Sequence, residues 1–215
     1  MKDDIKLVAV DIDGTFVRSD YTYDIPRFRH ILSRMNDVGC NFVVASGNQY
    51  YQLRDLFPGY YDEMSFVAEN GAFVKDRKEI VFTADMPKDT VDEVIDVCRE
   101  YPEIANVLCG VDIFRKRLEG KIEPTTSGHG SIDLIVPGCH KASGLKRFVE
   151  RWGISPEQCV AFGDGGNDIE MLQYCGHSYA MENASENVKS AARYVCPAND
   201  EDGVLSVLDK IFVSV

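Results

Sequence analysis

Five polar side chains stand directly after two apolar segments, at positions where they could hold a metal ion and an anionic group between them. They are Asp11, Asp13, Asp164, Asn167 and Asp168. Gly14 lets the chain turn after Asp13, so two carboxylates that are two residues apart can face the same cleft. Four carboxylates in one cleft repel one another strongly unless a cation lies among them. Mg2+ prefers a few carboxylates together with water and phosphate oxygens, so the pattern indicates a magnesium site.

Each of these loops also has an ordinary structural explanation. Asp-Gly is common in turns, and acidic loops are usually solvated in a chain whose formal net charge is −12. Both loops, however, follow segments that are typical of buried strands. Ligands of open α/β sheets bind outside the carboxyl ends of the strands, at the point where the strand order reverses. The position of the two loops therefore favours a shared site.

Two further residues occupy positions suited to binding an anion. Ser46, in the loop Ser46-Gly47-Asn48, could cap the helix that follows, and that role is compatible with phosphate binding at a helix start. Lys141 stands in the first turn of a predicted helix, where a positive charge is unfavourable for the helix dipole. That cost favours a specific role for Lys141 over a place on the surface.

Predicted strands and helices, which must position these residues, alternate along the chain. Apolar runs predict buried strands at 5–10, 41–45, 65–68 and 159–162, with short strands near 177–180 and 193–196. Helical spacing predicts helices at 26–38, from the Ser46 loop to about 57, at 169–174, and after 183 and 202. Buried strands separated by helices indicate an α/β fold, a Rossmann-like doubly wound parallel sheet covered on both faces.

The middle of the chain has a different pattern. We expect a hairpin at 72–74 and 79–82, a helix at 87–101, and short strands near 107, 122 and 132–136. Strands that pair through turns, together with a helix, are typical of a small α+β unit. The sequence therefore predicts a core of residues 1–74 and 139–215, with residues 75–138 as an inserted α+β cap domain.

Composition excludes several classes of function. The chain has 215 residues, 45% hydrophobic and 27% charged, with 23 Lys and Arg against 35 Asp and Glu. Such an acidic balance argues against nucleic acid and anionic membranes as partners. No apolar stretch approaches the roughly 18 residues of a membrane helix. The chain starts unlike a signal peptide, and its seven cysteines are scattered without a CxxC pair. A cytoplasmic protein with reduced thiols is expected.

Four segments resemble, in order, the four motifs of phosphatases of the haloacid dehalogenase (HAD) superfamily. They are Asp11-Ile-Asp-Gly-Thr15, Ser46, Lys141 and Gly163-Asp164-Gly165-Gly166-Asn167-Asp168. The segment Glu69-Asn70-Gly71-Ala72, and an insert between the second and third motifs, resemble the Cof-type branch. Residues 42–53 and 132–135 are similar to those of bacterial sugar phosphatases. The resemblance implies a Mg2+-dependent phosphatase of small phosphorylated metabolites, sugar phosphates above all.

The resemblance also implies a role for each motif residue. Asp11 would attack phosphorus to form an aspartyl-phosphate, and Asp13 would act as general acid and then general base. Mg2+ would be held by the Asp11 carboxylate, the Asp13 main-chain carbonyl and Asp164. Phosphoryl oxygens would be bound by four residues: Ser46, Gly47, Lys141 and Asn167. Asp168 would either orient Lys141 or assist with the metal, and Gly14 would support the turn.

Two departures from the Cof-type pattern stand out. Asn48 occupies a position where many members carry Arg. The insert is also shorter than usual by several tens of residues, and the missing part falls between about residues 111 and 121. Either a natural deletion or the removal of part of the cap would explain this.

Two other functions remain open from the sequence. A phosphomutase or phosphotransferase would use the same aspartyl-phosphate with a sugar as acceptor. A phosphosugar-binding module would lack catalysis, although degenerate members of the family should have lost one of the three carboxylates that this chain keeps: Asp11, Asp13 and Asp164.

Overall fold

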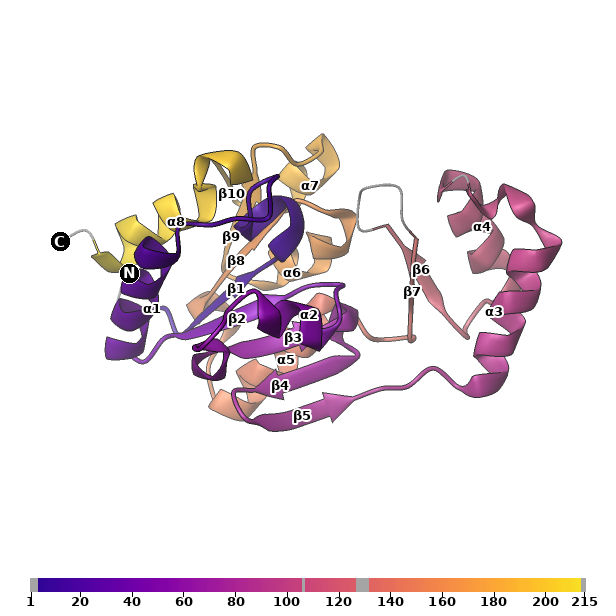
Figure 1. The fold of residues 1–215 in the computed structure, drawn as a ribbon, viewed down its shortest axis with the longest axis horizontal. Helices are drawn as coiled ribbons and strands as arrows, with labels where there is room; N and C mark the ends of the chain where they lie inside the picture. The colour runs from indigo at the N-terminus through magenta and orange to yellow at the C-terminus, as the bar shows by residue number, and fades with distance from the viewer. Residues whose placement is uncertain (1–3, 106, 127–131, 214–215) are drawn as a thin grey trace.

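One eight-stranded sheet forms the centre of the molecule in the computed structural model, which describes residues 4–105, 107–126 and 132–213 (Figure 1). The strand order is β10-β9-β8-β1-β2-β3-β4-β5, and the six strands from β10 to β3 are parallel. The parallel strands are β1 (Leu7–Val10), β2 (Asn41–Ala45), β3 (Ser65–Ala68), β8 (Cys159–Gly163), β9 (His177–Met181) and β10 (Tyr194–Cys196). The strand order confirms the predicted parallel α/β architecture.

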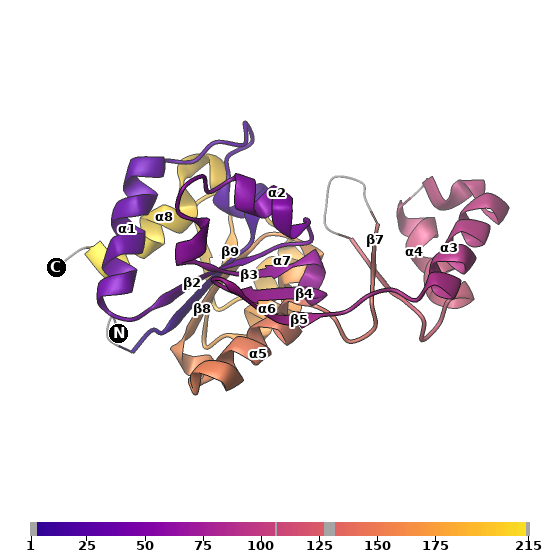
Figure 2. The ribbon, with the colours of Figure 1, turned by 60° about the horizontal axis from the view of Figure 1, so that its bottom comes forward.

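The two faces of the sheet bury alternate residues of each strand. In β1, Val8 and Val10 pack in the cluster that contains α1, α2 and α8, whereas Leu7 and Ala9 pack against α5, α6 and α7. Figure 2 shows α1, α2 and α8 on one side of the sheet and α5 on the other. The helices are α1 (Ile25–Asp37), α2 (Tyr50–Asp55), α5 (Lys141–Trp152), α6 (Ile169–Tyr174), α7 (Glu186–Ala191) and α8 (Gly203–Leu208).

The hairpin that we expected in the insert belongs to the core sheet instead. β4 (Phe73–Asp76) pairs antiparallel with β3, and β5 (Glu79–Thr83) pairs antiparallel with β4. Local turn residues predict that two such strands pair with each other, but they do not say which sheet the pair joins. Val74 is buried against α5, so the hairpin covers apolar surface of the core. We therefore propose that the insert begins after Thr83, rather than at residue 75.

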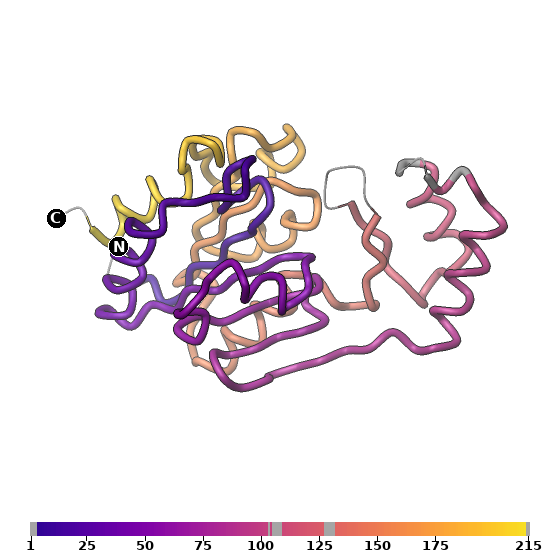
Figure 3. Tube along the Cα trace, viewed as in Figure 1, coloured from indigo at the N-terminus to yellow at the C-terminus, as the bar shows by residue number. Residues whose placement is uncertain are grey.

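The insert has its own small apolar cluster of Val97, Phe114, Leu118 and Ile122. Its elements are α3 (Lys88–Glu100), α4 (Val107–Arg117), β6 (Glu123–Thr125) and β7 (Asp133–Ile135). Figure 3 shows β6 and β7 between the core and the pair of helices α3 and α4. In the described part of the chain, no helix has both the length and the apolar character needed to cross a membrane.

The prediction of a strand near Val107 is wrong, because Val107 begins helix α4. β-branched residues and Gly110 give this segment a weak helical signal. Gly110 is required by packing: a Cβ there would lie 2.4 Å from Ile132 Cδ1 and 2.8 Å from the Ile104 carbonyl oxygen. The close approach of α4 to its neighbours thus explains a glycine inside a helix.

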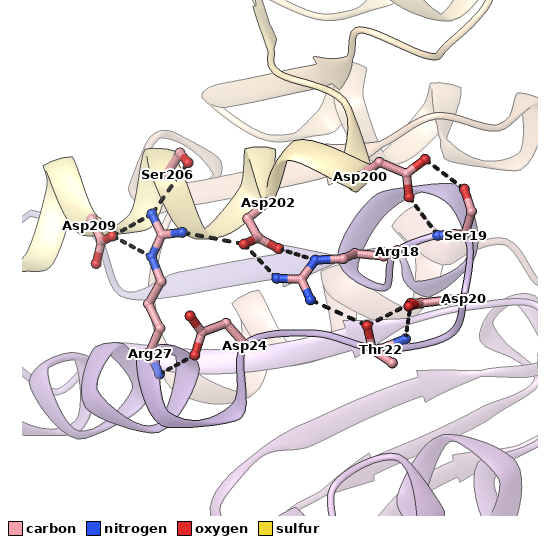
Figure 4. Close-up of polar contacts among 10 residues, drawn as sticks. All are labelled: Arg18, Ser19, Asp20, Thr22, Asp24, Arg27, Asp200, Asp202, Ser206 and Asp209. Atoms are coloured by element: carbon pink, nitrogen blue, oxygen red, sulfur yellow. Dashed lines mark hydrogen bonds and ion pairs between the residues drawn. The ribbon is translucent and has the colours of Figure 1, made fainter.

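Arginine–carboxylate contacts join the segments after β1 to the last helix of the core (Figure 4). Arg18 donates from Nε and Nη2 to the two carboxylate oxygens of Asp202, at 2.9 and 2.8 Å. Arg27, in α1, donates from Nε to Asp209 Oδ2 at 2.7 Å. The bidentate pair of Arg18 and Asp202 fixes orientation as well as contributing energy. These contacts hold α1 and α8 together on the face of the sheet away from α5.

Candidate active site

Three parallel strands bring the candidate residues to one edge of the sheet. In register, Val10 of β1 lies beside Val44 of β2 on one side and Phe162 of β8 on the other. The chain runs from β1 to β2 and β3 in one direction and from β8 to β9 and β10 in the other. The strand order therefore reverses at β1, where a crevice for ligands is expected. Asp11, Ser46 and Asp164 follow the three central strands at this edge.

Lys141 lies at the centre of the site. Its Nζ donates to Asp11 Oδ1 and to Asp168 Oδ1, each at 2.6 Å, and the side chain is 1% exposed. Burial alone would lower the pKa of Lys141, but the charges of Asp11 and Asp168 outweigh it and raise that pKa above its ordinary value. A buried, charged lysine is therefore stabilised by two carboxylates rather than exposed to solvent. His140 caps the helix that begins at Lys141.

The ionised form of Asp11 is disfavoured in this buried environment. Burial is the main reason that its pKa is raised well above the ordinary value, while Lys141 opposes that shift and Asp168 and Asp164 add to it. An additional positive charge beside Asp11 would favour its ionised form.

Asp168 is bound by protein groups through both carboxylate oxygens. Oδ1 accepts from Lys141, and Oδ2 accepts from the main-chain N–H groups of Asp164 at 3.0 Å and Gly165 at 2.9 Å. One side chain thus orients Lys141 and shapes the loop that carries Asp164. Of the two roles left open by the sequence, the geometry favours orientation of Lys141.

Asp164 is held against the first loop by Thr15 and Gly14. Thr15 Oγ1 donates to Asp164 Oδ1 at 2.6 Å. Gly14 has φ +75°, and a Cβ there would lie 2.5 Å from Asp164 Oδ2. Both the backbone conformation and the available space therefore demand glycine at this position. Sequence reasoning included Gly14 but gave no role to Thr15.

The acidic cluster fits a divalent cation. Ligand oxygens of Asp11, Asp164 and Asp168 all lie within 4.8 Å of one another. Because both oxygens of Asp168 already accept hydrogen bonds from protein groups, Asp11 and Asp164 are the carboxylates of this cluster that suit a hard cation such as Mg2+. The carboxylate of Asp13 is not part of this group, and the role of its main-chain carbonyl as a metal ligand stays a prediction.

Asp13 is oriented by the loop after β2. Asn48 Nδ2 donates to Asp13 Oδ2 at 2.7 Å, and the main-chain N–H of Asn48 donates to Ser46 Oγ at 3.1 Å. Sequence reasoning treated Asn48 only as a missing arginine, so this contact was not expected. Its signal was present, since a short amide beside Ser46 is a good partner for a neighbouring carboxylate.

Asn167 lies beside Asn70, a residue to which sequence reasoning gave no role. Asn167 Nδ2 donates to Asn70 Oδ1, and Asn70 Nδ2 donates to Asp133 Oδ2, both at 3.0 Å. Gly47 lies against the same pair, because a Cβ on it would be 3.0 Å from Asn70 Nδ2 and from Asp133 Oδ2. Since Asp133 belongs to β7, this is a direct contact between the insert and the candidate site.

Two cavities of about 350 and 460 Å3 are lined by residues of both the core and the insert. The smaller contains Asn70 and Asn167 from the core and Arg115 and Glu123 from the insert. Spaces of this size accommodate small organic ligands.

The profile of the haloacid dehalogenase-like hydrolases matches residues 8–114 and 110–208 of the chain. The 5-amino-6-(5-phospho-D-ribitylamino)uracil phosphatase YbjI of Escherichia coli (strain K12) is 38% identical over 260 residues, with 96% of each chain covered. Phosphoglycolate phosphatase 1 of Saccharolobus solfataricus is 27% identical over 220 residues, also with 96% of each chain covered. A crystal structure of SMU.1108c from Streptococcus mutans UA159 gives a TM-score of 0.91 at 32% identity, over 98% of this chain and 100% of that chain.

The chain belongs to the haloacid dehalogenase-like hydrolases, and the resemblance seen in its sequence is confirmed. It is a phosphoric monoester hydrolase that acts on small phosphorylated substrates. Phosphatases of this family generally use a divalent metal, which agrees with the cluster of Asp11, Asp164 and Asp168.

Proposed function

We propose that this protein is a Mg2+-dependent phosphatase that hydrolyses sugar or sugar-alcohol phosphates through an aspartyl-phosphate intermediate, in the cytoplasm. The arrangement that carries the proposal is the buried Lys141 ammonium between Asp11 and Asp168 at the carboxyl edge of the sheet. It keeps a carboxylate nucleophile fixed beside a positive charge that can receive phosphoryl oxygens.

In the first step, a carboxylate oxygen of Asp11 bonds to phosphorus while the bond from phosphorus to the ester oxygen breaks. The protonated carboxyl group of Asp13 gives its proton to the leaving alkoxide, which departs as an alcohol. The Asn48 contact holds Asp13 in place for this transfer. The product of the step is an aspartyl-phosphate on Asp11 and an ionised Asp13.

In the second step, water attacks the phosphorus of the aspartyl-phosphate. Asp13, now a carboxylate, takes a proton from that water, and the bond between phosphorus and Asp11 breaks. Inorganic phosphate leaves, and both aspartates return to their starting forms. A single residue thus serves as acid and then as base.

Phosphoryl charge must be held through both steps by groups that do not react. We assign this role to Ser46, the main-chain N–H of Gly47, Lys141 and Asn167. Mg2+ would be held by Asp11, Asp164 and the Asp13 main-chain carbonyl, and would offset the negative charge shared by the carboxylates and the phosphoryl group. Asp168 supports the set by orienting Lys141.

Chelation of divalent cations is expected to abolish phosphate release from a sugar phosphate. We expect EDTA to stop turnover and added Mg2+ to restore it. Mg2+ should also raise the melting temperature, because a ligand that binds only the folded state stabilises it. The Asp164→Asn variant should lose that stabilisation, whereas Asp37→Asn, an exposed change of the same kind, should keep it. Turnover that persists in EDTA would contradict the metal assignment.

Release of free phosphate separates hydrolysis from transfer. A phosphomutase or phosphotransferase would yield a new phosphate ester, whereas the proposed reaction yields inorganic phosphate in equal amount to the alcohol. The intact Asp13 supplies the base that hydrolysis requires, since its carboxylate can remove a proton from the attacking water.

The proposed class of substrate is supported by the phosphate ester that a relative of this chain hydrolyses. The name of YbjI describes a phosphate on a ribityl chain, which is derived from a sugar alcohol. Polar side chains from the insert, Arg115 and Glu123 among them, line the adjoining cavity and suit hydroxyl groups. We therefore propose a polyhydroxylated leaving group.

Substrate selection is expected to be broad, because the insert is short. The match to YbjI extends over 260 residues against 215 in this chain, and the two matched segments of the family profile meet at 110–114, inside α4. Fewer contacts to the leaving group leave less remote binding energy to distinguish sugars. We expect kcat/KM for several sugar phosphates to lie within about tenfold, or about 1.4 kcal/mol. A strong preference for a single sugar phosphate would contradict this expectation.

A further inference from the structure

Three side chains form a hydrogen-bonded line from the insert into the phosphate site. Asp133 of β7 accepts from Asn70, and Asn70 accepts from Asn167, with both distances 3.0 Å. Asn70 is 4% and Asn167 is 9% exposed, so water has little access to the two amides. We name Asp133, Asn70 and Asn167 the amide relay.

The relay has a direction that its chemistry imposes. A carboxylate accepts hydrogen bonds but donates none, whereas a side-chain amide accepts at one end and donates at the other. Asp133 therefore requires Asn70 to present Nδ2, which turns Asn70 Oδ1 toward Asn167. Asn167 must in turn present Nδ2. The carboxylate on the insert thus fixes the orientation of both amides.

We propose that Asp133, acting through Asn70, is the positioning residue that keeps Asn167 Nδ2 directed for phosphate binding. This inference rests on the proposed function, in which Asn167 contacts phosphoryl oxygens. Nδ2 carries two hydrogens, of which Asn70 takes one, so the other remains to meet an anion. A reversed Asn167 would present a carbonyl oxygen there, which repels a phosphoryl oxygen.

Contacts within the core hold Asn70, the middle residue of the amide relay, in place. The insert supplies only Asp133, the residue that sets the direction of the hydrogen bonds. Asn70 has φ +51°, a conformation that Asn and Asp tolerate better than other side chains. Its main-chain N–H donates to the Ser46 carbonyl at 3.1 Å. Gly47 leaves the space in which Asp133 and Asn70 meet. Displacement of the insert would therefore remove Asp133 while Asn70 stays beside the site.

Binding of inorganic phosphate, in the presence of Mg2+, tests the proposal without a leaving group. We expect Asp133→Asn to raise the phosphate Kd about tenfold, because an amide at position 133 can present its nitrogen as well as its oxygen and no longer fixes the orientation of Asn70 and Asn167. Its kcat/KM should fall by a similar factor for sugar phosphates and for p-nitrophenyl phosphate. Asp96→Asn, at an exposed carboxylate of α3, is the matched control and should change neither value.

A second variant tests direction rather than charge. In the double variant Asn70→Asp with Asp133→Asn, the carboxylate moves one position along the relay and the net charge is unchanged. Residue 70 would still accept from Asn167 Nδ2, so the phosphate Kd should recover most of the loss.

Three results of these measurements would each contradict a different step of the proposal. An unchanged phosphate Kd in Asp133→Asn, with loss confined to sugar phosphates, would make Asp133 a ligand of sugar hydroxyls and overturn the relay. Failure of the double variant to recover would overturn the directional argument. A wild-type protein that binds no phosphate would contradict the proposed function itself, and the inference with it.

Discussion

Replacement of Asp11 by Asn is expected to abolish turnover while the fold survives. The amide is nearly the same size as the carboxylate, and its oxygen can still accept the hydrogen bond that Lys141 Nζ gives to Asp11 Oδ1. Lys141 also keeps its second partner, Asp168. An amide oxygen, however, is too weak a nucleophile to form the aspartyl-phosphate. Loss of a catalytic nucleophile typically costs about 10⁶-fold in kcat.

Phosphate release and thermal unfolding, measured on the same preparation, check this result. The control is Asp37→Asn, which makes the same change at an exposed carboxylate of α1 and should preserve activity. Because deamidation of the introduced asparagine would regenerate aspartate, intact mass must be confirmed before the assay. Turnover clearly above background in such a preparation would show that Asp11 is not the nucleophile.

Replacement of Asp13 by Ala is expected to cause a loss that depends on the leaving group. The nucleophile remains, but no side chain protonates the departing alkoxide. General acid catalysis is worth about 10²–10⁴-fold, so a sugar phosphate should lose activity on that scale. An aryl phosphate such as p-nitrophenyl phosphate should lose less, because its phenolate leaves without a proton.

The ratio of the two losses is the informative quantity. It is obtained from kcat/KM for both substrates in wild type, in Asp13→Ala, and in Asp62→Ala as a control at an exposed carboxylate of the core. Loss of the Asn48 contact affects both substrates alike, whereas loss of the proton donor does not. Equal losses would mean that Asp13 serves only to shape the site.

The strands and helices of the core could be predicted because their signals are local. The buried run that became β1, the run that became β8 and the helical spacing that became α1 each lie within a dozen or so residues. Residues at the ends of such strands could be placed at one edge, since parallel strands align their carboxyl ends. Asp11, Ser46 and Asp164 were found in this way.

Pairing between segments that are distant in the chain could not be predicted from local sequence patterns. The β4–β5 hairpin has a clear turn, yet its attachment to β3 depends on which apolar surface it covers. The strand expected near Val107 became a helix because Phe114 and Leu118 are buried together in the insert. At Val107 a local preference was overruled, and for the hairpin the choice of sheet was made, by burial that forms only when the chain is folded.

The sequence by itself determined the class of this protein, its α/β core and the carboxylates and lysine at the edge of the sheet. Only the tertiary structure decided how those groups are oriented: Lys141 by Asp168, Asp13 by Asn48, and Asn167 by Asn70 and Asp133. The relay joins residues 97 and 63 positions apart in the chain. Orientation of a side chain depends on partners that meet only through folding, whereas the identity and spacing of residues are already present in the unfolded chain.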